Sequence, residues 1–284
     1  MTSAPVPVPI DLRAEMRAAA ASLAHGAHRS GGRAVTSDLS IDEALLLHSI
    51  GWEPVDLVFG VSVASVPAGV WTWTRVPGEI AAASNAHNLA VRAASTRLGR
   101  ECAAVGGHGV VGVRVGVAVH PHHVDVELMG TAVRPVKGSK APASVFVSDL
   151  SARDFTLLSA AGWYPVGLAF GASFVYSPRR GAAAAMRQSG QNIELTNLTE
   201  AMYSARESAM ERMQSSGLAM SAQGVVAVSI TEGPMHFAHQ VIGFTAWGTA
   251  VRLVADSHRS IAPKMVLPLD DAVLQFDAGS LRGH

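Results

Sequence analysis

A segment near the start of the chain reads Ser37-Asp-Leu-Ser-Ile-Asp-Glu-Ala-Leu-Leu-Leu-His-Ser-Ile-Gly-Trp-Glu-Pro54, and 111 residues later the chain reads Ser148-Asp-Leu-Ser-Ala-Arg-Asp-Phe-Thr-Leu-Leu-Ser-Ala-Ala-Gly-Trp-Tyr-Pro165. Later segments repeat at slightly larger offsets: Gly109-Val-Val-Gly-Val113 corresponds to Gly224-Val-Val-Ala-Val228, and Gly130-Thr-Ala-Val-Arg134 corresponds to Gly248-Thr-Ala-Val-Arg252. Insertions in surface loops account for the larger offsets, because loops tolerate extra residues better than helices or strands do. The sequence therefore predicts a tandem duplication of one small module.

Each copy is predicted to fold as a strand, a helix and two further strands, with a short helix in front. In the first copy the β-branched run over residues 55–66 is typical of a strand. A longer helix is expected over residues 84–102. Valines then alternate with small or charged residues over 111–119, which predicts a half-buried strand, and residues 124–133 form the returning strand of a hairpin. The predicted fold class is α+β, with two tandem β-α-β-β modules.

The repeat divides the chain into four parts. Residues 1–35 are rich in Pro, Val and Ala, and they are predicted to form a flexible N-terminal arm. The first module is assigned to residues 36–140 and the second to residues 141–260. Residues 261–284 are predicted to be a partial repeat that caps a module, because Leu267-Pro-Leu-Asp-Asp-Ala-Val-Leu274 is similar to the first helix of the repeat. A chance similarity among Leu, Ala and Asp is the alternative.

The repeated glycine- and valine-rich segments resemble the YbjQ family, which carries the label "putative heavy-metal-binding". The resemblance covers residues 52–134 and 163–252. It is carried by Gly109-Val-Val-Gly-Val113 and Gly130-Thr-Ala-Val133 in the first copy, and by Ala205-Arg206-Glu207, Gln223-Gly-Val-Val-Ala-Val228 and Gly248-Thr-Ala-Val251 in the second. The family's usual Gly-Ala-Asn before the Val-Val-Gly strand is replaced in both copies. These motifs are structural, so the resemblance says more about the fold than about an activity.

The resemblance implies a β-α-β-β subunit that assembles into five-fold rings, in which extra short strands join neighbouring subunits. We therefore expect a ring-forming homo-oligomer. Because one chain carries two modules, five chains can build two stacked five-module rings, whereas three chains can alternate the two modules in one six-module ring. The divergence of the two copies favours the pentamer, since like faces then meet only like faces.

Three histidines form the candidate metal site. His120, His122 and His123 lie at the predicted hairpin tip of the first copy, and the second copy has His236 and His239 near the same place. Clustered imidazoles can bind zinc, copper or nickel, so the cofactor this cluster would take is a divalent transition metal. A solvent-exposed, histidine-rich turn without a metal is the alternative. It is favoured, because the spacing matches no closed metal site.

Three other features could have either a functional role or an ordinary role in packing. Cys102 is interpreted as a buried small hydrophobe and not as a reactive thiol, because it lies in an alanine-rich helix. Trp52 and Trp163 are expected to anchor the cores at equivalent buried positions instead of stacking on a ligand. Trp71-Thr-Trp73 has no counterpart in the second copy, which makes it the better candidate for a contact surface of the first module.

The composition argues against several classes of partner. Lys and Arg together number 22, as do Asp and Glu, so no net charge attracts nucleic acid. No stretch reaches 18 uncharged apolar residues, which argues against a membrane partner. The single cysteine and the absence of a signal-peptide pattern indicate a cytoplasmic protein. Because 49% of the residues are apolar and only 15% are charged, we expect additional surface to be buried between subunits.

The function predicted from these features is that of a non-enzymatic, homo-oligomeric ring or scaffold protein that can bind a small ligand or a metal ion. No Ser-His-Asp, paired-carboxylate or dinucleotide-binding arrangement stands out in the sequence. Two alternatives remain: a metal-handling protein that uses the hairpin histidines, and an enzyme whose site lies between the two modules. The N-terminal arm is also a candidate docking segment for a protein partner.

Overall fold

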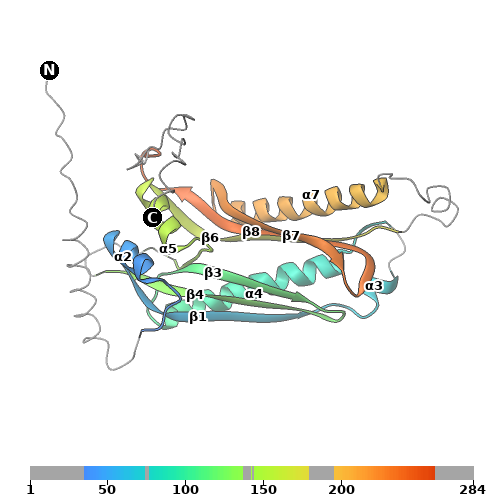
Figure 1. The fold of residues 1–284 in the computed structure, drawn as a ribbon, viewed down its shortest axis with the longest axis horizontal. Helices are drawn as coiled ribbons and strands as arrows, with labels where there is room; N and C mark the ends of the chain where they lie inside the picture. The colour runs from blue at the N-terminus through green and yellow to red at the C-terminus, as the bar shows by residue number, and fades with distance from the viewer. Residues whose placement is uncertain (1–34, 74–76, 137–141, 143, 179–194, 260–284) are drawn as a thin grey trace, which may run out of the picture.

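The computed structural model describes residues 35–73, 77–136, 142, 144–178 and 195–259. We call residues 35–136 the first half and residues 142–259 the second half. Each half holds one long helix and most of one four-stranded sheet (Figure 1). The C-terminal tail and, except for Val35, the N-terminal arm defined in the sequence lie outside the described residues.

The two sheets have similar strand orders, which are β1-β4-β3-β5 and β2-β6-β8-β7. The first consists of β1 (Trp52–Ser65), β3 (Gly109–Val119), β4 (His123–Pro135) and β5 (Phe146–Val147). The second consists of β2 (Gly78–Glu79), β6 (Trp163–Tyr176), β7 (Gly224–Met235) and β8 (Ala238–Leu253). The helices are α2 (Ile41–Ser49), α3 (Val70–Trp73), α4 (Ala81–Ala104), α5 (Ala152–Ala160) and α7 (Thr196–Ala219).

The short helices α2 and α5 begin and end in the same way. The Ser40 hydroxyl accepts a hydrogen bond from the Glu43 backbone N–H, and the Glu43 carboxylate accepts one from the Ser40 N–H, which is a capping box. Ser151 caps the start of α5 with the same hydroxyl-to-backbone bond. Past the ends of these helices, Gly51 and Gly162 have φ values of 81° and 85°, a conformation that glycine adopts without strain.

Both long helices lie very close to one strand, α4 to β1 and α7 to β6. A Cβ atom at Gly60 of β1 would lie only 2.3 Å from the carbonyl oxygen of Ala94 in α4. A Cβ atom at Gly171 of β6 would lie 2.1 Å from the carbonyl oxygen of Ala209 in α7. The buried faces of both helices carry mainly alanines, so little side-chain volume separates helix from strand.

The irregular features of the first half recur in the second. The register of β1 against β4 shifts between Pro54 and Asp56, and that of β6 against β8 shifts between Pro165 and Gly167. The hairpin strands β3 and β7 shift register between Val111 and Arg114 and between Val226 and Ser229. Positive φ angles occur at Gly106 and Gly112 and, 115 residues later, at Ser221 and Ala227. A residue of the first half therefore has its counterpart in the second half at a fixed difference in residue number for each element. The difference is 111 from β1 to β6, 115 from α4 to α7 and from β3 to β7, and 118 from β4 to β8.

The two halves are joined by exchanged short strands. β2 of the first half pairs with β6 of the second, and β5 of the second half pairs with β3 of the first. The helix α4 contacts β1 and β4 of its own sheet and also β6, whereas α7 lies on the outer side of the second sheet (Figure 1). One large hydrophobic core consequently contains residues from both halves.

The predicted α+β class and the strand-helix-strand-strand order are confirmed in both halves. The expected helix over 84–102 corresponds to α4, which extends two to three residues further at each end. Within the described residues, no helix is both long enough and apolar enough to cross a membrane.

Candidate functional site

The hairpin that joins β3 and β4 brings two histidines and one carboxylate together. The His120 N–H donates to the His123 carbonyl and closes the turn, and the two imidazole rings stack with centroids 4.5 Å apart. The Nε2 atoms of His120 and His123 lie 3.4 Å and 3.5 Å from the carboxylate oxygens of Asp125. One ligand atom from each residue lies within 4.8 Å of the others, so the three side chains could hold one metal ion.

The chemistry of this group fits a borderline metal ion such as zinc, nickel or copper(II), because its donors are two imidazole nitrogens and one carboxylate oxygen. Oδ1 of Asp125 is buried and accepts no hydrogen bond, so it is available as a ligand. Softer ions prefer thiolates, and Cys102 is buried in α4 away from this turn. The group includes His120 and His123 from the sequence prediction, but it does not include His122.

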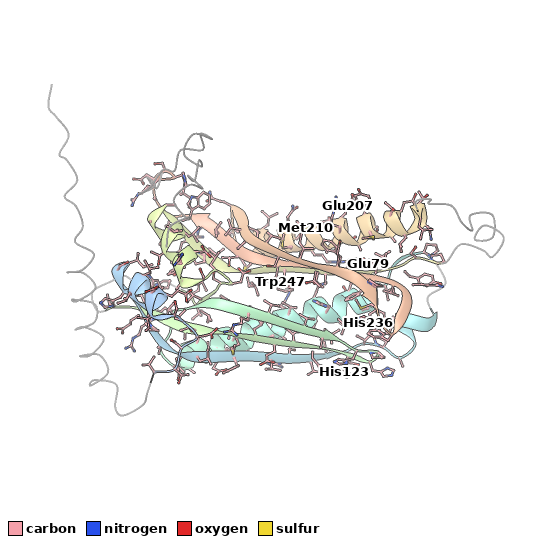
Figure 2. All side chains as sticks on the ribbon, in the orientation of Figure 1. Glu79, His123, Glu207, Met210, His236 and Trp247 are labelled. Carbon is pink, nitrogen blue, oxygen red and sulfur yellow. The ribbon has the colours of Figure 1, made fainter. Side chains whose placement is uncertain are left out.

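A cavity of about 410 Å³ lies between the two halves, close to this hairpin. Its wall combines β3 of the first half with β7 and β8 of the second, and it is mostly apolar: Val115, Val117, Val119, Phe174, Phe237 and Trp247. His236 at the end of β7 lines the cavity as well, and it lies at the same end of the molecule as His123 (Figure 2).

His87 of α4 is the one imidazole in the cavity wall that is almost fully buried. Burial lowers the pKa of His87 to about 4, so the ring is neutral at physiological pH. Its Nδ1 atom has no hydrogen-bond partner, and its ring packs 5.7 Å from that of Phe174. A mostly apolar cavity with a single unpaired imidazole nitrogen can bind a small apolar molecule that carries one polar group.

Two other ionisable groups with shifted pKa values, Glu79 and Asp149, have hydrogen-bond partners that indicate structural roles. Burial alone would raise the pKa of Glu79, but hydrogen bonds from Arg212, Ser84 and Ser173 outweigh it and lower the pKa. Burial raises the pKa of Asp149, and this effect exceeds the lowering caused by the hydrogen bond that its carboxylate accepts from the Thr249 hydroxyl. The Glu79 group joins β2 and α7, and therefore the two halves, while Asp149 and Thr249 fix the segment before α5 to β8.

Cys102 and Trp71 have packing roles. Cys102 is fully buried, and burial raises the pKa of its thiol to about 11, which agrees with its interpretation as a small hydrophobe. Trp71 packs edge-on against Phe174 and Phe237 of the second half, and its indole N–H donates to the Pro121 carbonyl. The contact surface expected at Trp71 thus lies inside the chain, between its halves.

The expected burial of both repeat tryptophans is wrong for one of them. Trp52 is buried against Phe146 and Phe155, but Trp163 is only partly buried and donates its indole N–H to His258. The difference arises because Phe146, which covers Trp52, belongs to the segment that crosses from the second half to β3.

Sequence reasoning also missed His87 and the ion pair between Glu79 and Arg212. Helical spacing carried a signal for His87, since it lies on the same face of α4 as the buried Ala83, Ala90 and Ala94. No local pattern marked Glu79, because β2 is only two residues long.

Comparison with known proteins gives two matches. The model of the family described as "Putative heavy-metal-binding" matches residues 180–254, which include α7, β7 and β8. The chain is also 35% identical over 245 residues to the encapsulin nanocompartment protein Rv1762c of Mycobacterium tuberculosis (strain ATCC 25618 / H37Rv), and the match covers 84% of this chain and 93% of that protein. No solved structure matches the chain. The resemblance to the YbjQ family is thereby confirmed for the second half.

Proposed function

This chain belongs to the family of the encapsulin nanocompartment protein Rv1762c, and we propose that it is a non-enzymatic, self-assembling scaffold protein of such a nanocompartment. The observation that carries the proposal is the extent of the similarity, which covers 93% of the relative's length. The exposed apolar side chains on β1, α7 and β7 support it, because surfaces of this kind are typical of protein-protein contacts.

The chain consists, in this proposal, of two copies of one YbjQ-like module, with boundaries at residues 36–140 and 141–260. The family match to residues 180–254 supports the second copy directly. The first copy is supported by its equivalent register shifts, its equivalent positive φ angles and the equally close helix-strand contacts at Gly60 and Gly171. Unrelated domains would not share irregularities of this kind at equivalent positions of equivalent strands.

A test of the scaffold role starts from full-length protein expressed alone. Mass photometry is expected to show an assembly of several chains at micromolar concentration. In a lysate of the source organism, the chain should co-sediment with nanocompartment particles on a density gradient, and mass spectrometry of the particle fraction should detect it. A chain that is monomeric when purified and absent from the particle fraction contradicts the proposal.

A second candidate function is metal handling by the hairpin group. The arrangement of His120, His123 and Asp125 favours it, together with the buried oxygen of Asp125 that accepts no hydrogen bond. Metal-free protein titrated with Zn²⁺ in a calorimeter should bind about one ion per chain, and His120→Ala and His123→Ala should each abolish the binding. His122→Ala is the matched control, because His122 lies in the same turn but outside the group. Equal binding by all three variants would remove this candidate.

The enzyme alternative requires a site between the halves, and the cavity at His87 is its natural place. The cavity wall offers one neutral imidazole among mainly apolar side chains, which suits ligand binding better than acid-base chemistry. We therefore place the cavity in the proposal as a ligand site of the scaffold.

A further inference from the structure

Equivalent faces of β1 and β6 differ sharply in exposure. On β6, one face of the strand is buried: Phe170, Ala172 and Phe174 are 8%, 0% and 1% exposed. The equivalent residues of β1 form an open apolar row: Phe59, Val61 and Val63 are 39%, 51% and 64% exposed. We call this row, with Glu127 and Met129 of the neighbouring β4, the strand face.

The first half covers the β6 face inside the chain. The Asn88 side chain of α4 accepts a hydrogen bond from the Ala172 N–H and donates one to the Ala172 carbonyl. Ser84 Oγ accepts one from the Phe174 N–H. We call this contact of α4 and β3 with β6 and β8 the internal joint. Nothing among the described residues covers the equivalent face of β1, which leaves Val61 and Val63 exposed.

The surface that would cover the strand face lies in the second half, on α7 and β7. On α7, Met202 is exposed, whereas its α4 counterpart His87 is buried in the internal joint. On β7, Ile230 is likewise exposed, and its counterpart Val115 packs against the shared core. We call Met202, Arg206 and Ile230, together with the surface between them, the helix face.

Among the described residues, the start of β7 also lacks an occupant that the start of β3 has. The Phe146 ring lies directly over Gly109 of β3, where an added Cβ would be 2.1 Å from the ring. At the equivalent Gly224 of β7, the nearest atom to an added Cβ is Val251 Cγ2 at 3.9 Å, so the space is open. Val35 stands 111 residues before Phe146, so it is the counterpart of Phe146 in the repeat. It is exposed, as expected in a single chain if its place is over Gly224 of another chain.

We propose that copies of this chain join head to tail through an external joint, in which the helix face of one chain covers the strand face of the next. The inference rests on the proposed function, because it names the surfaces by which the scaffold assembles. The external joint repeats the internal one, with α7 in the place of α4 and β1 in the place of β6. Such a contact is heterologous, so it closes a ring in which first and second halves alternate.

The predicted pentamer of two stacked rings does not agree with this joint. In that arrangement α4 of one chain would have to cover β1 of another, but α4 already covers β6 of its own chain. Head-to-tail joining leaves the internal joint intact. Each closed ring therefore alternates first and second halves and contains an even number of them, as in the three-chain, six-module ring.

Charges on the two faces are complementary. In the internal joint, Val91 of α4 and Thr245 of β8 line the same small cavity. Their equivalents are Arg206 on the helix face and Glu127 on the strand face, both exposed. Head-to-tail joining would therefore place opposite charges together, whereas joining two strand faces would bring one Glu127 towards another.

The experiment uses full-length chains with one face disabled. Val61→Arg places a charge in the middle of the strand face, and Met202→Glu adds a carboxylate to the helix face, which meets Glu127 in the proposed joint. Each variant alone is expected to be monomeric in native mass spectrometry. A 1:1 mixture should give species that contain the two variants in equal number, the smallest being one chain of each, because one intact strand face and one intact helix face remain. Leu89→Arg, which changes an exposed leucine of α4, is the control and should keep the wild-type mass.

The charge pair provides an independent readout that does not depend on apolar contacts. Arg206→Glu and Glu127→Arg should each weaken assembly by about two- to five-fold, and the double variant should restore it, since every joint then holds an exchanged pair. Folding of all variants is checked by melting temperature against Leu89→Arg.

The outcomes separate this inference from the proposed function. A monomeric wild-type protein defeats the scaffold role itself. A wild-type assembly that Val61→Arg and Met202→Glu leave intact defeats only the external joint. Variants that lose assembly singly and form no mixed species when combined show that the two faces do not meet.

Discussion

Gly60 and Gly171 should be the most sensitive glycines in the two sheets, because each lies directly beneath a helix backbone. In Gly60→Ala the new Cβ would start 2.3 Å from the Ala94 carbonyl oxygen and 2.7 Å from the Leu98 nitrogen. In Gly171→Ala it would start 2.1 Å from the Ala209 oxygen and 2.6 Å from the Met213 nitrogen. These are backbone atoms, so no side-chain rotation relieves the contact.

The cost follows from how far the helix must move. To restore an ordinary contact distance, the helix must retreat by about 1 Å, and a gap of about that size removes a quarter to a half of the dispersion energy of each contact it opens. Overpacking costs about 1–3 kcal/mol, and the upper end applies here because the clash is with backbone. At about 2–4 °C per kcal/mol for a chain of this size, each variant should melt about 6–12 °C below wild type.

Thermal unfolding followed by circular dichroism measures this effect, with Gly99→Ala as the control. Gly99 lies inside α4, an added Cβ there meets nothing within 4 Å, and alanine favours a helix over glycine by up to about 1 kcal/mol. The control should therefore melt at or above the wild-type temperature. If Gly60→Ala also melts there, the close helix-strand contact is wrong. If only one of the two glycine positions is sensitive, the halves are not equivalent.

Three further predictions concern ionisable groups whose pKa values are shifted. Burial lowers the pKa of His87 from 6.5 to about 4, so the wild-type protein should lose up to about 3 kcal/mol of unfolding free energy as the pH falls between these values. Urea unfolding of His87→Leu should not show this loss. Parallel pH curves for the two proteins would contradict the burial of His87. The pKa of Glu79 is lowered, so its stabilising effect is present above its ordinary pKa of 4.5 and is lost as the pH falls through the folded pKa. Glu79→Gln should therefore cost about 0.5–1 kcal/mol at pH 7, a figure reduced for partial exposure, and nothing well below pH 4. An equal cost at both pH values would refute the ion-pair origin. Burial raises the pKa of the Cys102 thiol to about 11. At pH 8, a disulfide reagent should therefore react with the native protein at least about 100-fold more slowly than with the protein unfolded in guanidinium. A fast reaction of the native protein would show that the thiol is accessible.

The elements and their repetition could be predicted from the sequence, because they follow from local patterns. The capping serines and the helix-ending glycines define α2 and α5, and the alternating valines define β3. Local patterns do not say which of two equivalent faces is covered. Met202 and His87 occupy the same helical position, and only the assembled chain shows that one is exposed and the other buried.

The candidate site was predictable in part for the same reason. The hairpin turn placed His120 and His123 together, and both residues precede the start of β4 or lie at it. The inclusion of Asp125 and the exclusion of His122 depend on side-chain direction, which alternates along a strand and is fixed only when the register of the hairpin is known. The exchange of β2 and β5 was implied by the family resemblance alone, because strands of two residues carry no periodic signal.

The divergence between the halves has a physical logic if the chain assembles head to tail. The internal joint forms within one chain, where the linked halves meet at high effective concentration, so it can accommodate a cavity of about 410 Å³ and the unpaired nitrogen of His87. The external joint must form by collision between separate chains. Opposite charges steer such encounters and disfavour the wrong pairing, and these are the properties that Arg206 and Glu127 add where the internal joint has Val91 and Thr245. The same module would thus serve as a permanent contact at one boundary and as a selective one at the other, which a ring of identical single modules could not provide.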